Sequence, residues 1–192
     1  MRHEISRMET PLGPILWAEH DGALIALEFA ASRSAFEARL AKRDGHGVTF
    51  ARGRARGPIA RRLRAYFGGD LRALDDIPVA AHGTPFQRRV WDALRRIPAG
   101  RTASYREIAT RVGAPSASRA VGSANAANPV ALVVPCHRVV RSDGSLCGYA
   151  GGVSKKAWLL EHEGTRGASA HHRRGAGGSV TRLLRATAVS RT

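Results

Sequence analysis

The sequence predicts an α+β protein, and two features of the chain lead to this prediction. Near the N-terminus, two apolar segments with alternating polarity flank Asp21-Gly22, a pattern typical of a β-hairpin. After residue 80, apolar residues recur at helical spacing behind capping residues. The 192 residues, 43% of them hydrophobic, suffice for one large domain or two small ones. We expect an α+β scaffold at 1–80, a mainly helical domain at 81–164 and a disordered basic tail at 165–192.

The N-terminal region should hold the hairpin and one helix. The segment GPILWAEHDGALIALEF predicts the two hairpin strands. Residues 41–57, rich in Gly and Arg, predict a loop or a frayed strand. The segment PIARRLRAYFGG predicts a helix that stops at Gly68-Gly69 and buries a stripe made of Ile59, Leu63, Tyr66 and Phe67. No residue here carries recognisable chemistry, so this region should be scaffold.

The second region opens with the start of a helix. Thr84 and Gln87 form a capping box, and Pro85 suits the first helical position. Pro98 and Gly100 should end the helix. Its buried stripe is predicted to consist of Phe86, Val90, Leu94 and Ile97.

The next segment predicts a helix-turn-helix. A second capping box, Ser104 with Glu107, begins a short helix that runs to Val112. Gly113 turns the chain, and a second helix should occupy 116–126. Any helical hairpin with a glycine turn produces the same pattern, so the motif alone does not establish DNA binding.

Three further segments complete the chain. The β-branched run VALVV at 130–134 predicts a strand that leads into Pro135. The segment GGVSKKAWLLEHEG predicts a last helix with Ser154 as its N-cap and Gly164 beyond its end. The tail holds Gly, Arg and Ser with few apolar residues, which is why we expect it to be disordered.

The chain is strongly basic, with a formal net charge of +16 and 31 Lys and Arg residues against 15 Asp and Glu. Six arginines and no acidic residue occur after residue 163, yet the rest of the chain is still basic. This excess predicts a polyanionic partner, and nucleic acid is the partner we expect. The alternative is that an Arg- and Ala-rich composition reflects only the codon usage of a GC-rich genome.

Cysteine content and hydropathy indicate the compartment. Two cysteines cannot build a disulfide framework, and the spacing of a four-cysteine zinc site is absent, so a reducing cytosol is expected. The N-terminal segment has no apolar signal region, and nowhere do 18 apolar residues run consecutively. We therefore expect a cytoplasmic protein that is neither secreted nor membrane-spanning.

The segment VVPCHRVV at 133–140 is the candidate reactive site. A lone cysteine is more often a small buried hydrophobe than a nucleophile. Cys136, however, is followed by His137, and imidazole is the usual base for a thiol. Pro135 fixes the direction of the chain, and the Asn128 amide, eight residues upstream, could pin backbone or orient a substrate.

The adjacency of these two residues raises a geometric objection. In an extended chain, neighbouring side chains point to opposite sides, so His137 could not easily touch the Cys136 sulfur. A bridging water would solve this, with a carboxylate on the other ring nitrogen. The charge of Arg138 could favour ionisation of the Cys136 thiol. Alternatively, Arg138 could be a structural ion-pair partner, and we prefer this second role. The candidate carboxylates are Glu161, Glu163 and Asp143.

The segments RAVGSANAANPVALVVPCHRVV and DGSLCGYAGGVSKKAWLL closely resemble the O6-alkylguanine-DNA alkyltransferases, also called methylated-DNA–protein-cysteine methyltransferases. The resemblance is dense from Thr84 to Glu163 and weaker over the N-terminal region, where it rests on TPLGPILWA and LEF. The tail lies outside it. The family fold implies a ribonuclease-H-like N-terminal domain, followed by a helical domain with a helix-turn-helix and the active-site cysteine.

The resemblance implies the chemistry. Cys136 is the expected alkyl acceptor, attacking the alkyl carbon on O6 of guanine, and on O4 of thymine as a second lesion. His137 is the base acting through water, Glu163 orients that histidine, and Asn128 ties the helix-turn-helix to the active-site strand. The alkyl donor is the damaged DNA, so no cofactor and no metal are expected. Because a thioether has no easy leaving route, each molecule should react once.

The resemblance also implies how DNA is held. The target atom lies inside the base stack, so the nucleotide must be extruded. Arg119 matches the arginine that fills the space left by the base, and Tyr105 matches the tyrosine that pushes the neighbouring phosphate. Arg106 and Ser142 lie where the family contacts phosphates. Without the resemblance, Tyr105 would pass for a core aromatic and Arg119 for a solvated charge. The walls of the guanine pocket are expected to include Tyr149, Val139 and Cys147.

Some features depart from the family or leave alternatives open. Cys147 occupies a position of small residues and is either a filler or a second reactive thiol. The sequence lacks the cysteines that bind structural zinc in some relatives. It also lacks the four zinc-binding cysteines of the extra domain found in regulatory members of the superfamily, so we expect no role as a transcription factor. The rivals are a damage sensor without acceptor activity, a cysteine hydrolase and a plain helix-turn-helix binder. We expect a monomer on double-stranded DNA and leave open both cooperative binding and the preferred alkyl size.

Overall fold

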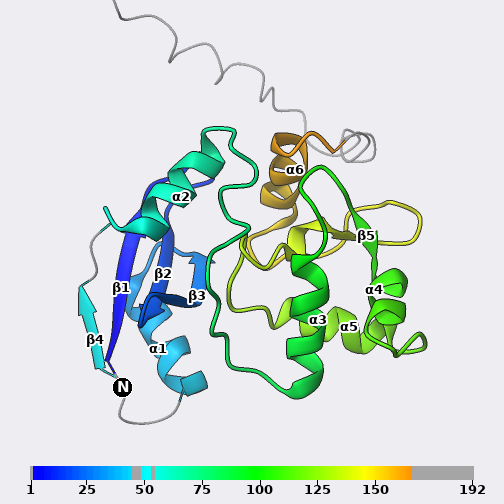
Figure 1. Cartoon of the computed structure of the whole chain (residues 1–192), viewed down its shortest axis with the longest axis horizontal. Coiled ribbons are helices and arrows are strands. Elements are labelled where there is room, and N and C mark those ends of the chain that lie inside the picture. Colours follow the sequence, from blue (N-terminus) through cyan, green and yellow to red (C-terminus); the bar gives the residue numbers. More distant parts are fainter. Residues whose placement is uncertain (1, 45–48, 53–54, 166–192) are drawn as a thin grey trace, which may run out of the picture.

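The computed structural model describes residues 2–44, 49–52 and 55–165. Its N-terminal half contains a four-stranded sheet in the order β3-β2-β1-β4, and its second half is mainly helical (Figure 1). The strands are β1 (Arg2–Met8), β2 (Ile15–His20), β3 (Ala23–Phe29) and β4 (Thr49–Arg52). The first three pair antiparallel, whereas β4 runs parallel to β1. This arrangement confirms the mixed helix and strand content expected from the sequence.

The predicted hairpin is confirmed. Strands β2 and β3 pair antiparallel across Asp21 and Gly22, and both of these residues adopt positive φ, at 49° and 78°. A two-residue turn of this kind matches the natural twist of the flanking strands. Asp tolerates the left-handed conformation and Gly adopts it without steric penalty.

The two faces of the sheet are covered by different elements. Alternate residues of β2 enter separate hydrophobic clusters, with Trp17 on one face and Leu16 on the other. Helix α1 (Arg33–Asp44) covers the Leu16 face through Phe36 and Leu40, which are fully buried. These residues are spaced one helical turn apart, so both point to the same side of the helix.

Helix α2 (Pro58–Phe67) packs on the opposite face of the sheet. Ile59, Leu63 and Tyr66 are buried as predicted, whereas Phe67 is only partly buried. The prediction of a loop or frayed strand at 41–57 is wrong at residues 41–44, which complete α1, whereas the strand alternative is confirmed at 49–52, which form β4. Residues 45–48 and 53–54 lie outside the described part of the chain. The apolar pair Phe36 and Leu40 holds the helix against the sheet despite the polar residues that follow.

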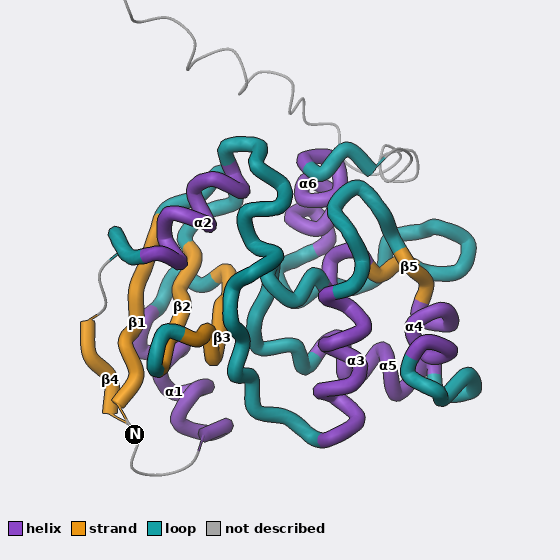
Figure 2. Tube along the Cα trace, viewed as in Figure 1, coloured by secondary structure: helices purple, strands orange, loops and turns teal. Residues whose placement is uncertain are grey.

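The second half begins with α3 (Pro85–Arg95), which is reached by a long connection through the middle of the molecule (Figure 2). Both halves of the predicted Thr84–Gln87 capping box are formed. Val90, Leu94 and Ile97 are buried, while Phe86 is partly buried. The remaining elements are β5 (Ala103–Ser104), α4 (Tyr105–Arg111), α5 (Ser118–Ala126), the 3-10 turn η1 (Cys136–Arg138), β6 (Val139–Val140) and α6 (Val153–His162).

Helix boundaries differ from the predictions, most clearly at the starts of α5 and α6. The Ser104–Glu107 capping box is confirmed, but α5 begins at Ser118 rather than at residue 116. Helix α6 is capped by Gly152, with φ at 94°, and not by Ser154, which lies inside the helix. A glycine adopts this backbone angle readily, so the helix starts two residues earlier than predicted. Gly164 follows the end of α6 with φ at 74°, as expected.

The predicted strand at 130–134 is wrong except at one residue. Val130 forms an isolated parallel bridge with Leu27 of β3, supported by hydrogen bonds from Leu27 N to Pro129 O and from Ala131 N to Leu27 O. Leu132 then adopts a φ of 70°, which ends the extended path. The β-branched residues are buried in a turn, so their hydrophobicity is satisfied without a strand. This bridge also joins the two halves of the molecule.

Other expectations fall partly outside what the structure describes. We predicted a disordered tail at 165–192, and residues 166–192 lie outside the part of the chain that the structure describes. Among the described residues, no helix has the length and apolar character needed to cross a membrane.

Gly83 allows a close approach between the start of α3 and Trp91. A Cβ at this position would lie 2.5 Å from Cη2 of Trp91, whose indole N–H donates to Ala124 O. We predict that Gly83→Ala lowers the free energy of unfolding by about 2 kcal/mol, because the buried ring must shift. Urea unfolding followed by circular dichroism would measure this. Gly148→Ala is the matched control, since a Cβ there has no neighbour within 4 Å. Equal stability of the two variants would contradict the prediction.

Candidate active site

The candidate nucleophile lies in a tight turn. Cys136 begins η1, and the N–H groups of Arg138 and Val139 donate to Pro135 O and Cys136 O. Cys136 is 5% exposed and His137 is fully buried. The chain therefore forms a turn here. The geometric objection assumed an extended chain and so does not apply.

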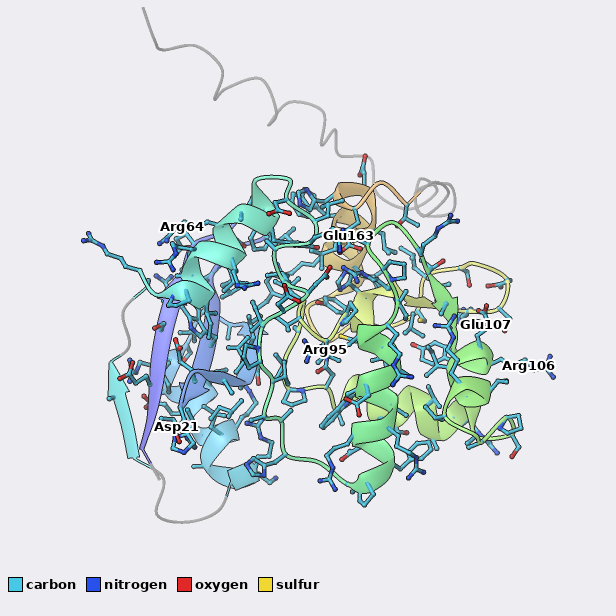
Figure 3. All side chains as sticks on the ribbon, viewed as in Figure 1. Asp21, Arg64, Arg95, Arg106, Glu107 and Glu163 are labelled. Atoms are coloured by element: carbon cyan, nitrogen blue, oxygen red, sulfur yellow. The ribbon has the colours of Figure 1, made fainter. Side chains whose placement is uncertain are left out.

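Glu163 is the carboxylate that holds His137. It lies just past the end of α6 and is buried (Figure 3). Its Oε1 is 3.0 Å from His137 Nε2. Of the other two candidates, Asp143 is solvent-exposed and accepts from the backbone N–H of Ser145, and Glu161 is exposed on α6. Tertiary packing thus selects one of the three carboxylates named from the sequence.

Glu163 also receives hydrogen bonds from two other buried side chains. Arg138 donates through Nε to Oε2 and through Nη2 to Oε1, both at 2.8 Å. Tyr66 donates its hydroxyl to Oε1 at 2.8 Å from α2, which is 97 residues away in sequence. The remaining Arg138 contact runs from Nη1 to Ile97 O at 2.5 Å. Arg138 is therefore a structural ion-pair partner, as preferred from the sequence.

The protonation states of this cluster follow from its hydrogen bonds. Burial acts to raise the pKa of Glu163, but hydrogen bonds and charge from His137 and Arg138 hold it well below its usual value. Burial lowers the pKa of His137, against the opposing effect of Glu163. Because an ionised carboxylate only accepts hydrogen bonds, His137 Nε2 must carry the proton. The neutral ring then presents an unprotonated Nδ1, which is the form of a general base.

The thiol of Cys136 needs such a base. Its burial raises the pKa of Cys136, although the Asn128 side chain, the Lys156 charge and nearby backbone N–H groups act in the opposite direction. A thiol is a poor nucleophile until it loses its proton. The buried cysteine and the neutral histidine next to it therefore form a matched acid and base.

Asn128 stabilises the segment that leads to the turn. Its Nδ2 donates to Val134 O at 2.8 Å, and its Oδ1 accepts from Val130 N at 3.0 Å. The side chain therefore bridges the two ends of the bend that precedes Cys136. Through these two hydrogen bonds, the Asn128 side chain stabilises the backbone between α5 and Cys136.

A cavity of about 780 Å³ opens onto Cys136. Asn128, Tyr105 and Tyr149 line it together with residues of β3, α1 and α5. Of the predicted pocket residues, Tyr149 lies in the wall, while Val139 is fully buried and does not line the cavity. Cys147 is half-buried and does not line this cavity.

Cys147 lies instead within a cluster of polar groups. The Tyr105 hydroxyl is 2.9 Å from Cys147 Sγ, and burial raises the pKa of Tyr105. Lys156 is fully buried and donates through Nζ to Val139 O at 2.5 Å and to Cys147 Sγ at 3.3 Å. Tyr105 is therefore a cavity residue whose hydroxyl faces the loop after β6.

The predicted phosphate-contacting residues lie elsewhere on the surface. Arg106 and Ser142 line a second hollow of about 390 Å³, next to Ser104 and Arg141. Arg106 extends outward from α4 (Figure 3). Arg119 is exposed on α5, so it is not part of the buried cluster. In the described part of the chain, no group of three or more His, Cys, Asp or Glu side chains could hold a metal ion.

Comparison with known proteins identifies the family. Residues 85–165 match the model of the 6-O-methylguanine DNA methyltransferase DNA-binding domain. The methylated-DNA–protein-cysteine methyltransferase of Salmonella typhimurium is 46% identical over 161 residues, 82% of this chain and 94% of that protein. The chain belongs to the methylated-DNA–protein-cysteine methyltransferase family. The relative from Mycobacterium leprae is 44% identical over 81% of this chain and 89% of its own length.

Solved structures of this methyltransferase family have the same fold. The O6-methylguanine methyltransferase of Mycobacterium tuberculosis superposes with a TM-score of 0.69 at 39% identity, over 87% of this chain and 96% of that chain. The structure of the same protein in complex with DNA gives a TM-score of 0.70 at 40% identity, over 86% and 96%. The resemblance inferred from the sequence is thus confirmed.

Sequence reasoning missed two buried residues of this methyltransferase site. Tyr66 was placed on the buried stripe of its helix, but only the fold brings its hydroxyl to Glu163. Lys156 lies one helical turn before Leu159 and Leu160, which are fully buried. That spacing places the lysine on the inner face of α6 and could have revealed it.

Removing the charge of Glu163 should destabilise the fold. We predict that Glu163→Gln lowers the free energy of unfolding by about 3 kcal/mol, because Arg138 would remain buried without a counter-charge. Guanidinium unfolding monitored by tryptophan fluorescence would measure the change. The matched control is Glu161→Gln, an exposed position on the same helix. A variant at 163 as stable as the one at 161 would show that Arg138 is satisfied without the carboxylate.

Proposed function

We propose that this protein repairs DNA by direct reversal, transferring an alkyl group from O6 of guanine irreversibly to Cys136. The observation that carries the proposal is the position of Cys136, on the wall of a cavity and next to a neutral histidine held by a buried carboxylate. Family membership supports it, and the DNA complex of the Mycobacterium tuberculosis protein supports DNA as the partner.

The transfer is a nucleophilic substitution. His137 takes the Cys136 proton through a bridging water, and Glu163 stabilises the imidazolium that forms. The sulfur attacks the alkyl carbon, the carbon–O6 bond breaks, and guanine leaves with the electron pair. Guanine takes up one proton at N1 from solvent, and the imidazolium of His137 returns the thiol proton to solvent. The product is a thioether at Cys136. Because a thioether is a poor leaving group, the protein acts once, and the step needs no cofactor.

The lesion reaches the cavity by nucleotide flipping. An alkylated O6 is inaccessible inside a duplex, so the nucleotide must leave the stack. Helices α4 and α5 form the proposed helix-turn-helix, with Arg119 entering the space left by the base and Tyr105 displacing the adjacent phosphate. Arg106 and Ser142, which share one surface hollow, would hold the backbone.

The finer architecture belongs to the same proposal. We assign residues 1–80 to a ribonuclease-H-like scaffold domain and 81–164 to the DNA-binding and alkyl-transfer domain. The protein is proposed to act as a monomer on double-stranded DNA, with O4-alkylthymine as a second substrate. The basic side chains exposed on α4 and α5 suit the phosphate backbone of such a substrate.

The acceptor can be identified by intact-protein mass spectrometry. After reaction with a duplex that carries one O6-methylguanine, we expect a mass gain of about 14 Da on the Cys136 peptide, as for an activated thiol. Cys136→Ser should abolish the gain, and Cys147→Ser, the matched control, should retain it. Tight binding to the lesion with no mass gain would overturn the proposal in favour of a damage sensor.

Nucleotide flipping can be tested at Arg119. We predict that Arg119→Ala slows methyl transfer from a duplex roughly tenfold more than transfer from a single strand, because only the duplex must fill the vacated stack. Single-turnover rates with both substrates measure this ratio. Arg111→Ala, an exposed arginine on α4, is the control. An equal loss on both substrates would show that Arg119 provides only general attraction to DNA.

A further inference from the structure

Tyr66 connects the N-terminal half of the molecule to the proposed base. It lies in the last turn of α2 and is fully buried. Its hydroxyl donates to Oε1 of Glu163 at 2.8 Å, although the two residues are 97 positions apart in the chain. The proposed transfer assigns no step to this hydroxyl. Its contact with the carboxylate that holds His137 nevertheless places it where it can affect the base.

Three donors share the oxygen that His137 contacts. Oε1 of Glu163 lies 3.0 Å from His137 Nε2, and it also accepts from Arg138 Nη2 and from the Tyr66 hydroxyl, both at 2.8 Å. A hydrogen bond donated to a carboxylate stabilises its charge and makes it a weaker base toward any further proton. Tyr66 and His137 therefore compete for the charge of one oxygen.

The surrounding contacts fix Tyr66 as a permanent donor. Burial, and then the charge and hydrogen bond of Glu163, raise the pKa of Tyr66 far above its usual value, so the hydroxyl keeps its proton. His162 donates through Nε2 to the backbone O of Tyr66 at 2.8 Å. The two rings also meet edge to face, with 5.3 Å between their centroids. The hydroxyl is thus held in one position and in one protonation state.

The groups that face His137 act on its protonation in opposite directions. Burial lowers the pKa of His137, whereas the hydrogen bond and charge of Glu163, just past the end of α6, raise it. The charges of Arg138 in η1 and Lys156 in α6 lower it further. Glu163 is therefore the group that favours the imidazolium, and a change of charge at its Oε1 is transmitted to the ring. Two neutral groups complete these surroundings, the thiol of Cys136 and the phenol of Tyr149.

We propose that Tyr66 is a positioning residue for the alkyl transfer, whose hydroxyl takes up part of the charge on Glu163 Oε1 and so keeps the His137 ring in its neutral form. The inference rests on the proposed function, in which His137 accepts the thiol proton. Without the hydroxyl, Oε1 would attract the proton on His137 Nε2 more strongly and would favour the imidazolium. An imidazolium has no free nitrogen and cannot act as the base.

The first test needs no DNA and uses Tyr66→Phe in the full chain. This variant keeps the ring, and Oε1 keeps two donors, so the carboxylate remains paired. In NMR spectra of protein labelled with 15N-histidine, the His137 Nε2 proton is assigned by its absence from His137→Gln. We expect this proton to move downfield in Tyr66→Phe, because its hydrogen bond to Glu163 becomes stronger. The matched control is Ile59→Val, a buried position on the same helix, which should leave the resonance unchanged.

The second test is the pH dependence of methyl transfer from a duplex with one O6-methylguanine, measured as single-turnover rate constants. Loss of the hydroxyl raises the pKa of His137, so the neutral ring is present only at higher pH. The midpoint of the acid limb should therefore rise by about half a pH unit, a fraction of the effect of one hydrogen bond to a charged group. On that limb, transfer becomes roughly threefold slower, and the plateau at high pH is retained. Ile59→Val should leave the midpoint unchanged.

Replacing Tyr66 with 3-fluorotyrosine tests the direction of the effect. Fluorine withdraws electrons from the ring, so the hydroxyl becomes a stronger donor to Glu163. The His137 Nε2 proton should then move upfield, and the midpoint of the acid limb should fall. Damage to packing alone would not shift the two variants of Tyr66 in opposite directions.

Several results would overturn the inference. An unchanged His137 resonance in Tyr66→Phe would show that the hydroxyl does not weaken the bond between His137 and Glu163. Transfer that is slower by the same factor at every pH would make Tyr66 a purely structural residue. A midpoint that falls in Tyr66→Phe would mean that the hydroxyl favours the imidazolium. If no variant and not even the unaltered protein accepted the methyl group, the proposed function would fail, whereas the NMR result would still decide the effect of Tyr66 on His137.

Discussion

The buried carboxylate of Glu163 is the interaction on which the rest of the site depends. Four hydrogen bonds converge on it, from Tyr66, from His137 and twice from Arg138. A charge in the interior is tolerated only when it is paired and fully hydrogen-bonded. The carboxylate therefore links α2, the nucleophile turn and the end of α6. It also determines the tautomer of His137, and through it which ring nitrogen can accept the thiol proton.

Burial controls the protonation of Cys136, the proposed acceptor, and of His137. Burial raises the pKa of the Cys136 thiol and lowers that of the His137 ring, so both groups are neutral in the resting protein. A neutral thiol is protected from adventitious reaction, since the thiolate is the reactive form. Lys156 and Asn128 oppose the effect of burial on Cys136 and so favour the thiolate. This arrangement suits the proposed single transfer, because the thiol must remain unreacted until the protein meets a lesion.

The N-terminal half does more than support the helical half. The bridge between Leu27 and Val130 joins the sheet to the segment that precedes Cys136. Tyr66 of α2 completes the hydrogen bonding of Glu163, and β3 and α1 supply one wall of the cavity. Both the chemistry and the space available to the substrate therefore depend on the contact between the halves. The sequence alone indicated no chemistry in this region, because its polar residues are spread among unrelated segments.

The sequence by itself determined the local features. The hairpin at Asp21-Gly22, both capping boxes and the buried stripes of α2 and α3 depend on residues within one or two turns of each other. The motif around Cys136 was recognisable for the same reason. Only the tertiary structure decided which of three carboxylates holds His137, why the run at 130–134 bends at Leu132, and which buried groups Tyr66 and Lys156 contact. These outcomes depend on contacts between residues far apart in the chain, and local propensity carries no information about such contacts.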